Sequence, residues 1–283
     1  MIELKSFFSR ATRRLLRRPA KTAIPASEVS FIPYIPTNTD ESKLLSDISL
    51  FFGLKETEVT AEFRDYSAFH VAQDYAQRLG ERKYLCFEEA FILYVIMKIT
   101  QPRTVVEIGT QYGKSTRRII DMINKLELNT RIICFDIVDQ VQYFTPEEAD
   151  LVLKDVTYTF QHDILETYAP DLIYLDAHPY NLLKNVIFDL VSTSNNCTLA
   201  IHDCSTGLCN PNMTLSKDDP NVTSRTGVWE RHVLAEIFGV KDVKSKQLDD
   251  IEMATHRLKI FDTLHGLAII SPKTWSQFEG GLG

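Results

Sequence analysis

Side chains able to do acid–base, hydrogen-bonding or metal chemistry follow a series of short apolar runs in this sequence. Such runs, rich in β-branched residues, are typical of strands buried in a parallel sheet. Ligands of doubly wound sheets bind where the strands end, so these side chains are expected to share one site. A set of acids suits an organic cation, ribose hydroxyls or a divalent metal better than a bare phosphate. The residues are Glu107, Asp136, Asp163, Asp176, His202 and Asp203.

The segment 104–116, Thr-Val-Val-Glu-Ile-Gly-Thr-Gln-Tyr-Gly-Lys-Ser-Thr, constrains function most tightly. Its apolar start ends in Glu107, and two glycines, Gly109 and Gly113, precede a helical pattern. Glycine at such a turn permits positive φ and lets a ligand approach the backbone closely. The spacing Glu-x-Gly-x-x-x-Gly differs from the Gly-x-Gly-x-x-Gly of dinucleotide binders, which argues against a nicotinamide-dependent dehydrogenase.

A second group of reactive residues lies further along the chain. Asp176 and His178 belong to the segment Leu-Asp-Ala-His-Pro-Tyr, and His202 and Asp203 follow the next apolar run. Histidine accepts a proton near neutral pH, which makes His178 a candidate general base. Asp176, His202 and Asp203 are candidate metal ligands, and the alternative is that His202 and Asp203 only hydrogen-bond a loop.

The elements that position these residues alternate between strand and helix after residue 104. This alternation predicts a doubly wound, mostly parallel sheet of seven strands. The last two strands are joined by three residues only, too few for a parallel crossover, so the last strand should be antiparallel. The expected strands are 104–108, 131–136, 157–161, 171–175, 198–202, 258–262 and 266–270. The expected helices are 115–126, 146–154, 180–192 and 225–238.

Three segments are predicted along the chain: a basic amphipathic arm (1–21), a linker leading into a helical cap (22–100), and the sheet domain (101–283). Helical periodicity marks Leu44–Phe52, Phe69–Leu79 and Cys86–Ile99 within the cap. The arm has seven basic residues against one acid, while the whole chain has a net charge of −7. The acidic remainder argues against nucleic acid as a partner. The arm either lies on an anionic membrane surface or packs on the body as a solvated segment.

The glycine segment and the strand ends resemble those of the class I S-adenosylmethionine-dependent methyltransferases, over about residues 100–271. The resemblance implies a Rossmann-like methyltransferase fold with an N-terminal helical extension. It places Glu107, Gly109, Thr110, Gly113 and Ser115 around the methionine part of S-adenosylmethionine. It also implies that Asp136 binds the ribose hydroxyls and that Asp163 lies by the adenine amino group.

Asp176 and the His202-Asp203 pair further resemble the metal-dependent O-methyltransferases that act on small molecules and sugars. The resemblance implies a bound Mg²⁺ or another divalent cation. His202 departs from the pattern, because that group has an acid at this position, and a histidine favours a softer metal such as Mn²⁺ or Zn²⁺. Tyr180 and a lid over residues 206–227, with Arg225, Trp229 and Glu230 at its end, are candidates for holding the acceptor.

The resulting prediction is an S-adenosylmethionine-dependent O-methyltransferase for a small-molecule or glycan hydroxyl. It assigns catalysis to His178 and Asp176. The alternatives are a non-catalytic nucleotide-binding or scaffold protein, and another nucleotide-using enzyme on the same fold. Five scattered cysteines favour a reducing cytoplasm, with peripheral membrane contact through residues 1–20 as a further option, and such enzymes often pair as homo-oligomers.

Overall fold

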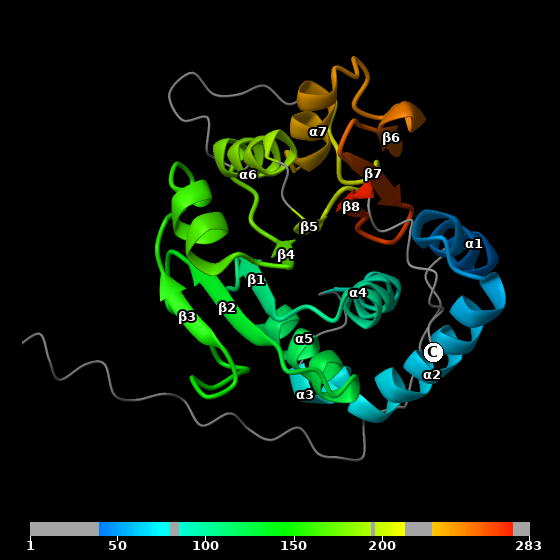
Figure 1. The fold of residues 1–283 in the computed structure, drawn as a ribbon, viewed down its shortest axis with the longest axis vertical. Coiled ribbons are helices and arrows are strands. Elements are labelled where there is room, and N and C mark those ends of the chain that lie inside the picture. Colours follow the sequence, from blue (N-terminus) through cyan, green and yellow to red (C-terminus); the bar gives the residue numbers. More distant parts are fainter. Residues whose placement is uncertain (1–39, 80–84, 194–195, 213–227, 274–283) are drawn as a thin grey trace, which may run out of the picture. The chain divides into compact units, whose positions relative to one another are not determined.

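The computed structural model describes residues 40–79, 85–193, 196–212 and 228–273, which build one mixed sheet flanked by helices (Figure 1). The sheet has eight strands in the order β3-β2-β1-β4-β5-β8-β7-β6. The strands are β1 (Thr104–Ile108), β2 (Arg131–Asp136), β3 (Asp150–Leu153), β4 (Leu172–Leu175), β5 (Thr198–Ile201), β6 (Asp250–Glu252), β7 (His256–Phe261) and β8 (Leu267–Pro272).

The five strands from β3 to β5 are parallel, and β8 pairs antiparallel with both β5 and β7. The strand order reverses beside β1, which pairs with β2 on one side and β4 on the other. This reversal is the point at which ligands bind in doubly wound sheets. The predicted fold class is therefore confirmed, including the antiparallel last strand, and β6 is an additional edge strand.

Helices cover both faces of the sheet (Figure 1). Because strand side chains alternate between faces, Val105 packs into the core with α4 (Phe87–Thr100) and α5 (Lys114–Lys125). Its neighbour Val106 packs into the other core with α6 (Tyr180–Ser192) and α7 (Glu230–Phe238). Two separate apolar layers thus cover the two faces of the sheet.

The residues before β1 form the predicted helical cap. It consists of α1 (Glu41–Phe52), α2 (Glu56–Gln73), the short α3 (Tyr75–Leu79) and α4. The side chain of Asp40 accepts a hydrogen bond from the Lys43 amide and caps α1. Helix α4 is buried along nearly its whole length and packs into the sheet core. The cap therefore supplies part of the core of the sheet domain.

Two predicted elements between β2 and β4 are wrong. The expected helix 146–154 is a turn followed by β3, and the expected strand 157–161 is a turn leading into the π-helical segment η2 (Gln161–Glu166). The Glu148 side chain accepts a hydrogen bond from the Thr145 amide, which imitates a helix start without a helix following. The Asp155 side chain accepts a hydrogen bond from the Thr157 amide, which favours a turn instead of a strand.

The predicted arm (1–21), the linker at 22–39 and most of the lid, including Arg225, lie outside the described residues. The domain boundaries at residues 21 and 100 stay predictions. Among the described helices, none is long and apolar enough to cross a membrane.

Candidate active site

A cavity of about 660 Å³ opens at the carboxyl ends of β1, β2, β4 and β5, where the strand order reverses. Most of the predicted site residues line it, although they come from four separate strand ends. These are Gly109, Thr110, Ser115, Asp136, Asp176, His178, His202 and Asp203. The structure therefore brings the two predicted groups, the glycine loop and the later Asp and His residues, into one cavity.

Glu107 lies fully buried beneath the glycine loop. Its carboxylate accepts hydrogen bonds from the hydroxyls of Ser115 and Thr116 at the start of α5. Burial raises the pKa of Glu107 to about 7, against the lowering effect of these two hydrogen bonds. The arrangement fits a residue that organises the glycine loop.

Both glycines of the loop are required by the packing. Gly109 has φ +93°, and a Cβ there would lie 2.3 Å from the backbone oxygen of Asp176. Gly113, with φ +80°, caps α5, and a Cβ there would lie 2.7 Å from the ring of Phe144. The loop after β1 therefore lies directly against the end of β4, which joins the two groups of site residues.

Asp136 is held in place by three backbone amides. Its Oδ2 accepts from Gln111 at 2.7 Å, and its Oδ1 accepts from Ile137 at 2.7 Å and Val138 at 3.1 Å. A carboxylate has about four acceptor sites, so capacity is left for a ligand hydroxyl. The acid thus fixes the glycine loop and faces the cavity at the same time.

Asp163 lies away from this cavity, in η2 rather than at a strand end. Its carboxylate pairs with Lys154 at 2.5 Å and lines a neighbouring hollow together with Thr157 and Asp189. Asp155, two residues after β3, lines the main cavity instead. Asp163 therefore does not line the main cavity, and its expected contact with adenine stays a prediction.

His178 lines the cavity and is held from behind by Glu230, a buried residue at the start of α7. The distance from His178 Nδ1 to Glu230 Oε1 is 2.7 Å, and Nε2 lies 3.8 Å from Asp203 Oδ2. Burial alone would lower the pKa of His178, but the hydrogen bond and charge of Glu230 raise it to about 9. In the ligand-free protein His178 therefore holds its proton at neutral pH, and a role as general base requires its release.

His202 lies at the centre of a buried cluster of carboxylates. Its Nδ1 is 3.1 Å from Asp176 Oδ1 and 3.2 Å from Asp203 Oδ1, and its Nε2 is 3.1 Å from Glu89 Oε2. Burial alone would lower the pKa of His202, yet Asp176 and Glu89 raise it well above its usual value. Burial alone would raise the pKa of Asp176, but the charge and hydrogen bond of His202 lower it below its usual value. Burial raises the pKa of Asp203 above its usual value.

The donor atoms of Asp176, His202 and Asp203 lie close enough together to hold one metal ion. A second such group is Glu89, His202 and His265. Glu89 and His265 were missed by the sequence analysis. The signal for Glu89 was present, because two consecutive acids begin the otherwise apolar run of α4, and a buried acid needs a partner.

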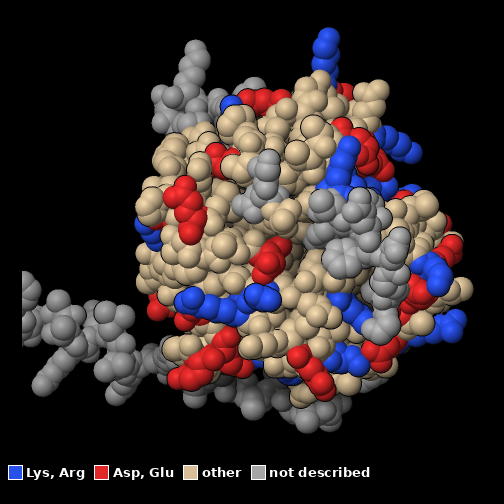
Figure 2. Space-filling model, in the orientation of Figure 1, with Lys and Arg blue, Asp and Glu red and all other residues tan. Residues whose placement is uncertain are grey.

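The expected acceptor-holding residues lie around α6 and α7. Tyr180 is buried, its hydroxyl donates to Glu236, and its ring packs edge-on against Trp229 with ring centroids 5.5 Å apart. These two residues pack the helices together, and Glu230 contacts His178, which lines the cavity. On the face drawn in Figure 2, acidic and basic side chains are interspersed among uncharged ones.

No family model and no curated protein matches the sequence. Among solved structures, the chain is similar to an O-methyltransferase from Bacillus cereus in complex with SAH, at 13% identity and a TM-score of 0.43 over 75% of this chain and 91% of that one. It is also similar to the SAH-bound methyltransferase PaMTH1 of Podospora anserina, at 12% identity and a TM-score of 0.40 over 85% and 99% of the two chains.

A third similar structure is cmcI with Mg and SAM, at 20% identity and a TM-score of 0.31. That likeness covers 39% of this chain and spans half (50%) of the length of the other. The solved proteins to which this chain is similar thus include methyltransferases and proteins with SAM or SAH bound.

Proposed function

We propose that this protein transfers the methyl group of S-adenosylmethionine to a hydroxyl of a small molecule or sugar. The observation that carries the proposal is the single cavity described above. In it, the glycine loop and the carboxylate of Asp136 adjoin a group of carboxylates and histidines at the neighbouring strand ends. The glycine loop and Asp136 suit the methyl donor. The carboxylates and histidines suit an acceptor hydroxyl, which must lose its proton.

Donor binding is assigned to the loop after β1 and to the acids beside it. Gly109 and Thr110 would lie along the methionine part, and Glu107 would keep this loop in shape through Ser115. Asp136 would accept a ribose hydroxyl, and Asp155 would lie nearer the base. The acidic surroundings favour a sulfonium cation over an anionic ligand.

The acceptor end of the cavity contains ligand atoms that fit a divalent metal ion. They belong to two carboxylates and one imidazole, and all lie within 4.8 Å of one another. Asp176, His202 and Asp203 would hold the ion. A bound ion would lower the pKa of an acceptor hydroxyl and orient it. This nitrogen-containing set suits Mn²⁺, Co²⁺ or Zn²⁺ better than Mg²⁺.

The reaction is an in-line displacement. The acceptor oxygen forms a bond to the methyl carbon, the carbon–sulfur bond breaks with its electrons going to sulfur, and S-adenosylhomocysteine leaves. The hydroxyl proton goes to His178 Nε2, the nitrogen opposite the one held by Glu230. A sulfonium bound nearby opposes a charged imidazole and so favours release of the proton that His178 holds without ligand. Alignment and exclusion of water supply most of the acceleration.

The first test is calorimetric titration of the full chain with S-adenosylhomocysteine. We expect micromolar binding that Asp136→Asn weakens by at least about tenfold, since a carboxylate–hydroxyl hydrogen bond is lost. Asp139→Asn is the matched control, because Asp139 is an exposed acid of the same loop and should leave binding unchanged. Absence of binding by the wild-type protein would overturn the proposal.

Acceptor chemistry is tested separately with methyl-labelled S-adenosylmethionine and a panel of catechols, phenols and monosaccharides. Transfer of the label to the hydroxyl oxygen of one of these classes of compound supports the proposed reaction and identifies the acceptor class. Tight binding of S-adenosylhomocysteine without transfer to any acceptor would favour the nucleotide-binding scaffold alternative.

A further inference from the structure

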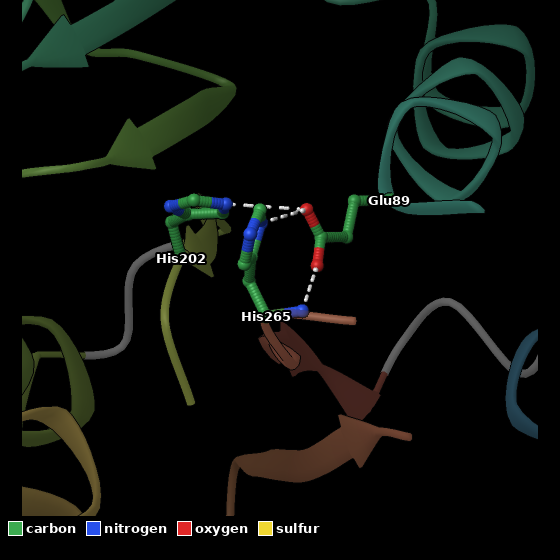
Figure 3. A group of neighbouring side chains, drawn as sticks. All are labelled: Glu89, His202 and His265. Carbon is green, nitrogen blue, oxygen red and sulfur yellow. Dashed lines mark hydrogen bonds and ion pairs between the residues drawn. The ribbon is translucent and has the colours of Figure 1, made fainter. Parts of the chain in front are cut away.

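Glu89 is a charged residue of the helical cap that reaches the centre of the active site. It projects from α4 toward His202 at the end of β5 and His265 in the turn before β8 (Figure 3). Its side chain is completely buried. A buried carboxylate is costly unless it is fully hydrogen-bonded, so its partners indicate its role.

Four donors occupy the carboxylate of Glu89. Oε2 accepts from the Cys86 amide at 3.1 Å and from His202 Nε2 at 3.1 Å. Oε1 accepts from the Thr263 hydroxyl at 2.7 Å and from the His265 amide at 3.0 Å. A carboxylate has about four acceptor sites, so the described contacts leave no free site on Glu89 for a metal ion. Glu89 is thus an acceptor that fixes its donors, and the group with His265 is not a second metal site.

Both ring nitrogens of His202 face carboxylates, Nε2 that of Glu89 and Nδ1 those of Asp176 and Asp203. An ionised carboxylate only accepts, so both nitrogens donate as long as no ion is bound. An ion held by Asp176 and Asp203 would take the place of the hydrogen on Nδ1, whereas Nε2 would keep its hydrogen for Glu89. Metal-binding histidines commonly donate their other ring N–H to a carboxylate, which fixes the ring and strengthens the ligand. Here the carboxylate comes from a helix outside the strand ends that supply the other ligands.

We propose that Glu89 is a positioning residue that sets His202 to bind a divalent transition-metal ion through Nδ1, together with Asp176 and Asp203. The inference rests on the proposed function only for what the ion does, because binding of the ion is measured without a methyl donor. It also assigns a task to the helical cap, which holds a metal ligand in place from outside the sheet.

The test is Mn²⁺ titration of the full chain, followed by the loss of the free Mn²⁺ signal in electron paramagnetic resonance. We expect Glu89→Gln to weaken Mn²⁺ binding by about 10- to 100-fold, the range for lost partners of metal-binding histidines. Glu88→Gln is the matched control, since it removes the same charge one residue away on α4. Equal Mn²⁺ affinity in Glu89→Gln and the wild type, or no Mn²⁺ binding by the wild type, would overturn the proposal.

A second measurement needs no variant and so does not depend on whether Glu89→Gln folds. Nitrogen-15 NMR of the histidine rings in the Zn²⁺-loaded wild type should show His202 with a protonated Nε2 and a metal-bound Nδ1. Coordination through Nε2 would contradict the inference. Titration of the same samples with S-adenosylhomocysteine distinguishes the two proposals, because a failure there leaves the metal result standing.

Discussion

The two ends of the cavity are built in opposite ways. The hydrogen bonds of the glycine-loop end (Gly109, Thr110 and Asp136) join the loops that follow two successive strands, such as that between Gln111 and Asp136, which are 25 residues apart. The histidine end (Asp176, His178, His202 and Asp203) depends on Glu89, 113 residues before His202. Most contacts of the first end use backbone amides, whereas those of the second use side chains. The hydrogen bonds of the first end thus lie within one strand–helix–strand segment of the sequence, whereas only the complete fold assembles the second end.

The largest expected effect separates the two ends by function. Asp203→Asn should lower methyl transfer by about 10²- to 10³-fold, in the range for loss of acid–base or metal assistance. It should change S-adenosylhomocysteine affinity by less than about threefold, because the glycine-loop end is untouched. Asparagine is chosen because residue 203 has φ +61°, which asparagine tolerates. Labelled-methyl transfer and calorimetry are the two measurements.

Parallel loss of transfer and of S-adenosylhomocysteine binding in Asp203→Asn would contradict a division of labour between the ends. Asp139→Asn serves again as the control, with both quantities expected to match those of the wild type.

The next effect tests where the two ends touch. Gly109→Ala should lower the free energy of unfolding by about 3 kcal/mol, because a Cβ would overlap the backbone at the end of β4 and the φ is unfavourable. Gly53→Ala is the matched control: Gly53 also has positive φ (+67°), but a Cβ there meets nothing within 4 Å. It should cost only about 1 kcal/mol. Urea unfolding measures both, and equal costs would show that the contact of the loop with β4 is unimportant.

A third effect concerns the helical cap on which the histidine end depends. Burial, with a smaller contribution from Arg118, lowers the pKa of His70 from 6.5 to about 4, and its ring packs edge-on against Phe87 of α4. The unfolded chain therefore binds the proton more readily, so the stability from this residue is present above pH 6.5 and is lost as the pH falls toward 4. The expected loss between pH 7 and pH 5 is about 2 kcal/mol.

Replacement of His70 by phenylalanine keeps the aromatic packing and removes the titration. Urea unfolding of His70→Phe at pH 7 and pH 5 should show a decrease in stability smaller than that of the wild type by about the same 2 kcal/mol. An unchanged decrease would assign the acid sensitivity to other groups.

The smallest expected effect tests which acid contacts the ligand at the glycine-loop end. Asp155→Asn should weaken S-adenosylhomocysteine binding by about fivefold, the equivalent of one hydrogen bond, since Asp155 lines the main cavity. Asp163→Asn should change it by less than about twofold. Calorimetry under the same conditions compares the two variants. The reverse order would restore Asp163 as the adenine contact.

The sequence predicted the parts of the fold whose patterns are local. The β-branched runs of β1 and β2 and the pair of glycines defined the first crossover, and the short link between β7 and β8 required an antiparallel pair. The region between β2 and β4 was predicted wrongly because Thr145 and Glu148 resemble a helix start, and because β3 is an edge strand of only four residues, too short to show an alternating pattern. At an edge, pairing with β2 rather than composition decides the conformation.

The sequence by itself determined the doubly wound sheet, the glycine loop with Asp136, and the residues Asp176, His178, His202 and Asp203 at strand ends. Only the tertiary structure decided that Asp155 replaces Asp163 in the cavity, that Glu230 holds His178, and that Glu89 fixes the ring of His202. The physical reason is that apolar periodicity and turn chemistry act within a few residues. A buried carboxylate finds its donors wherever packing brings them, and for Glu89 one of them lies 176 residues away.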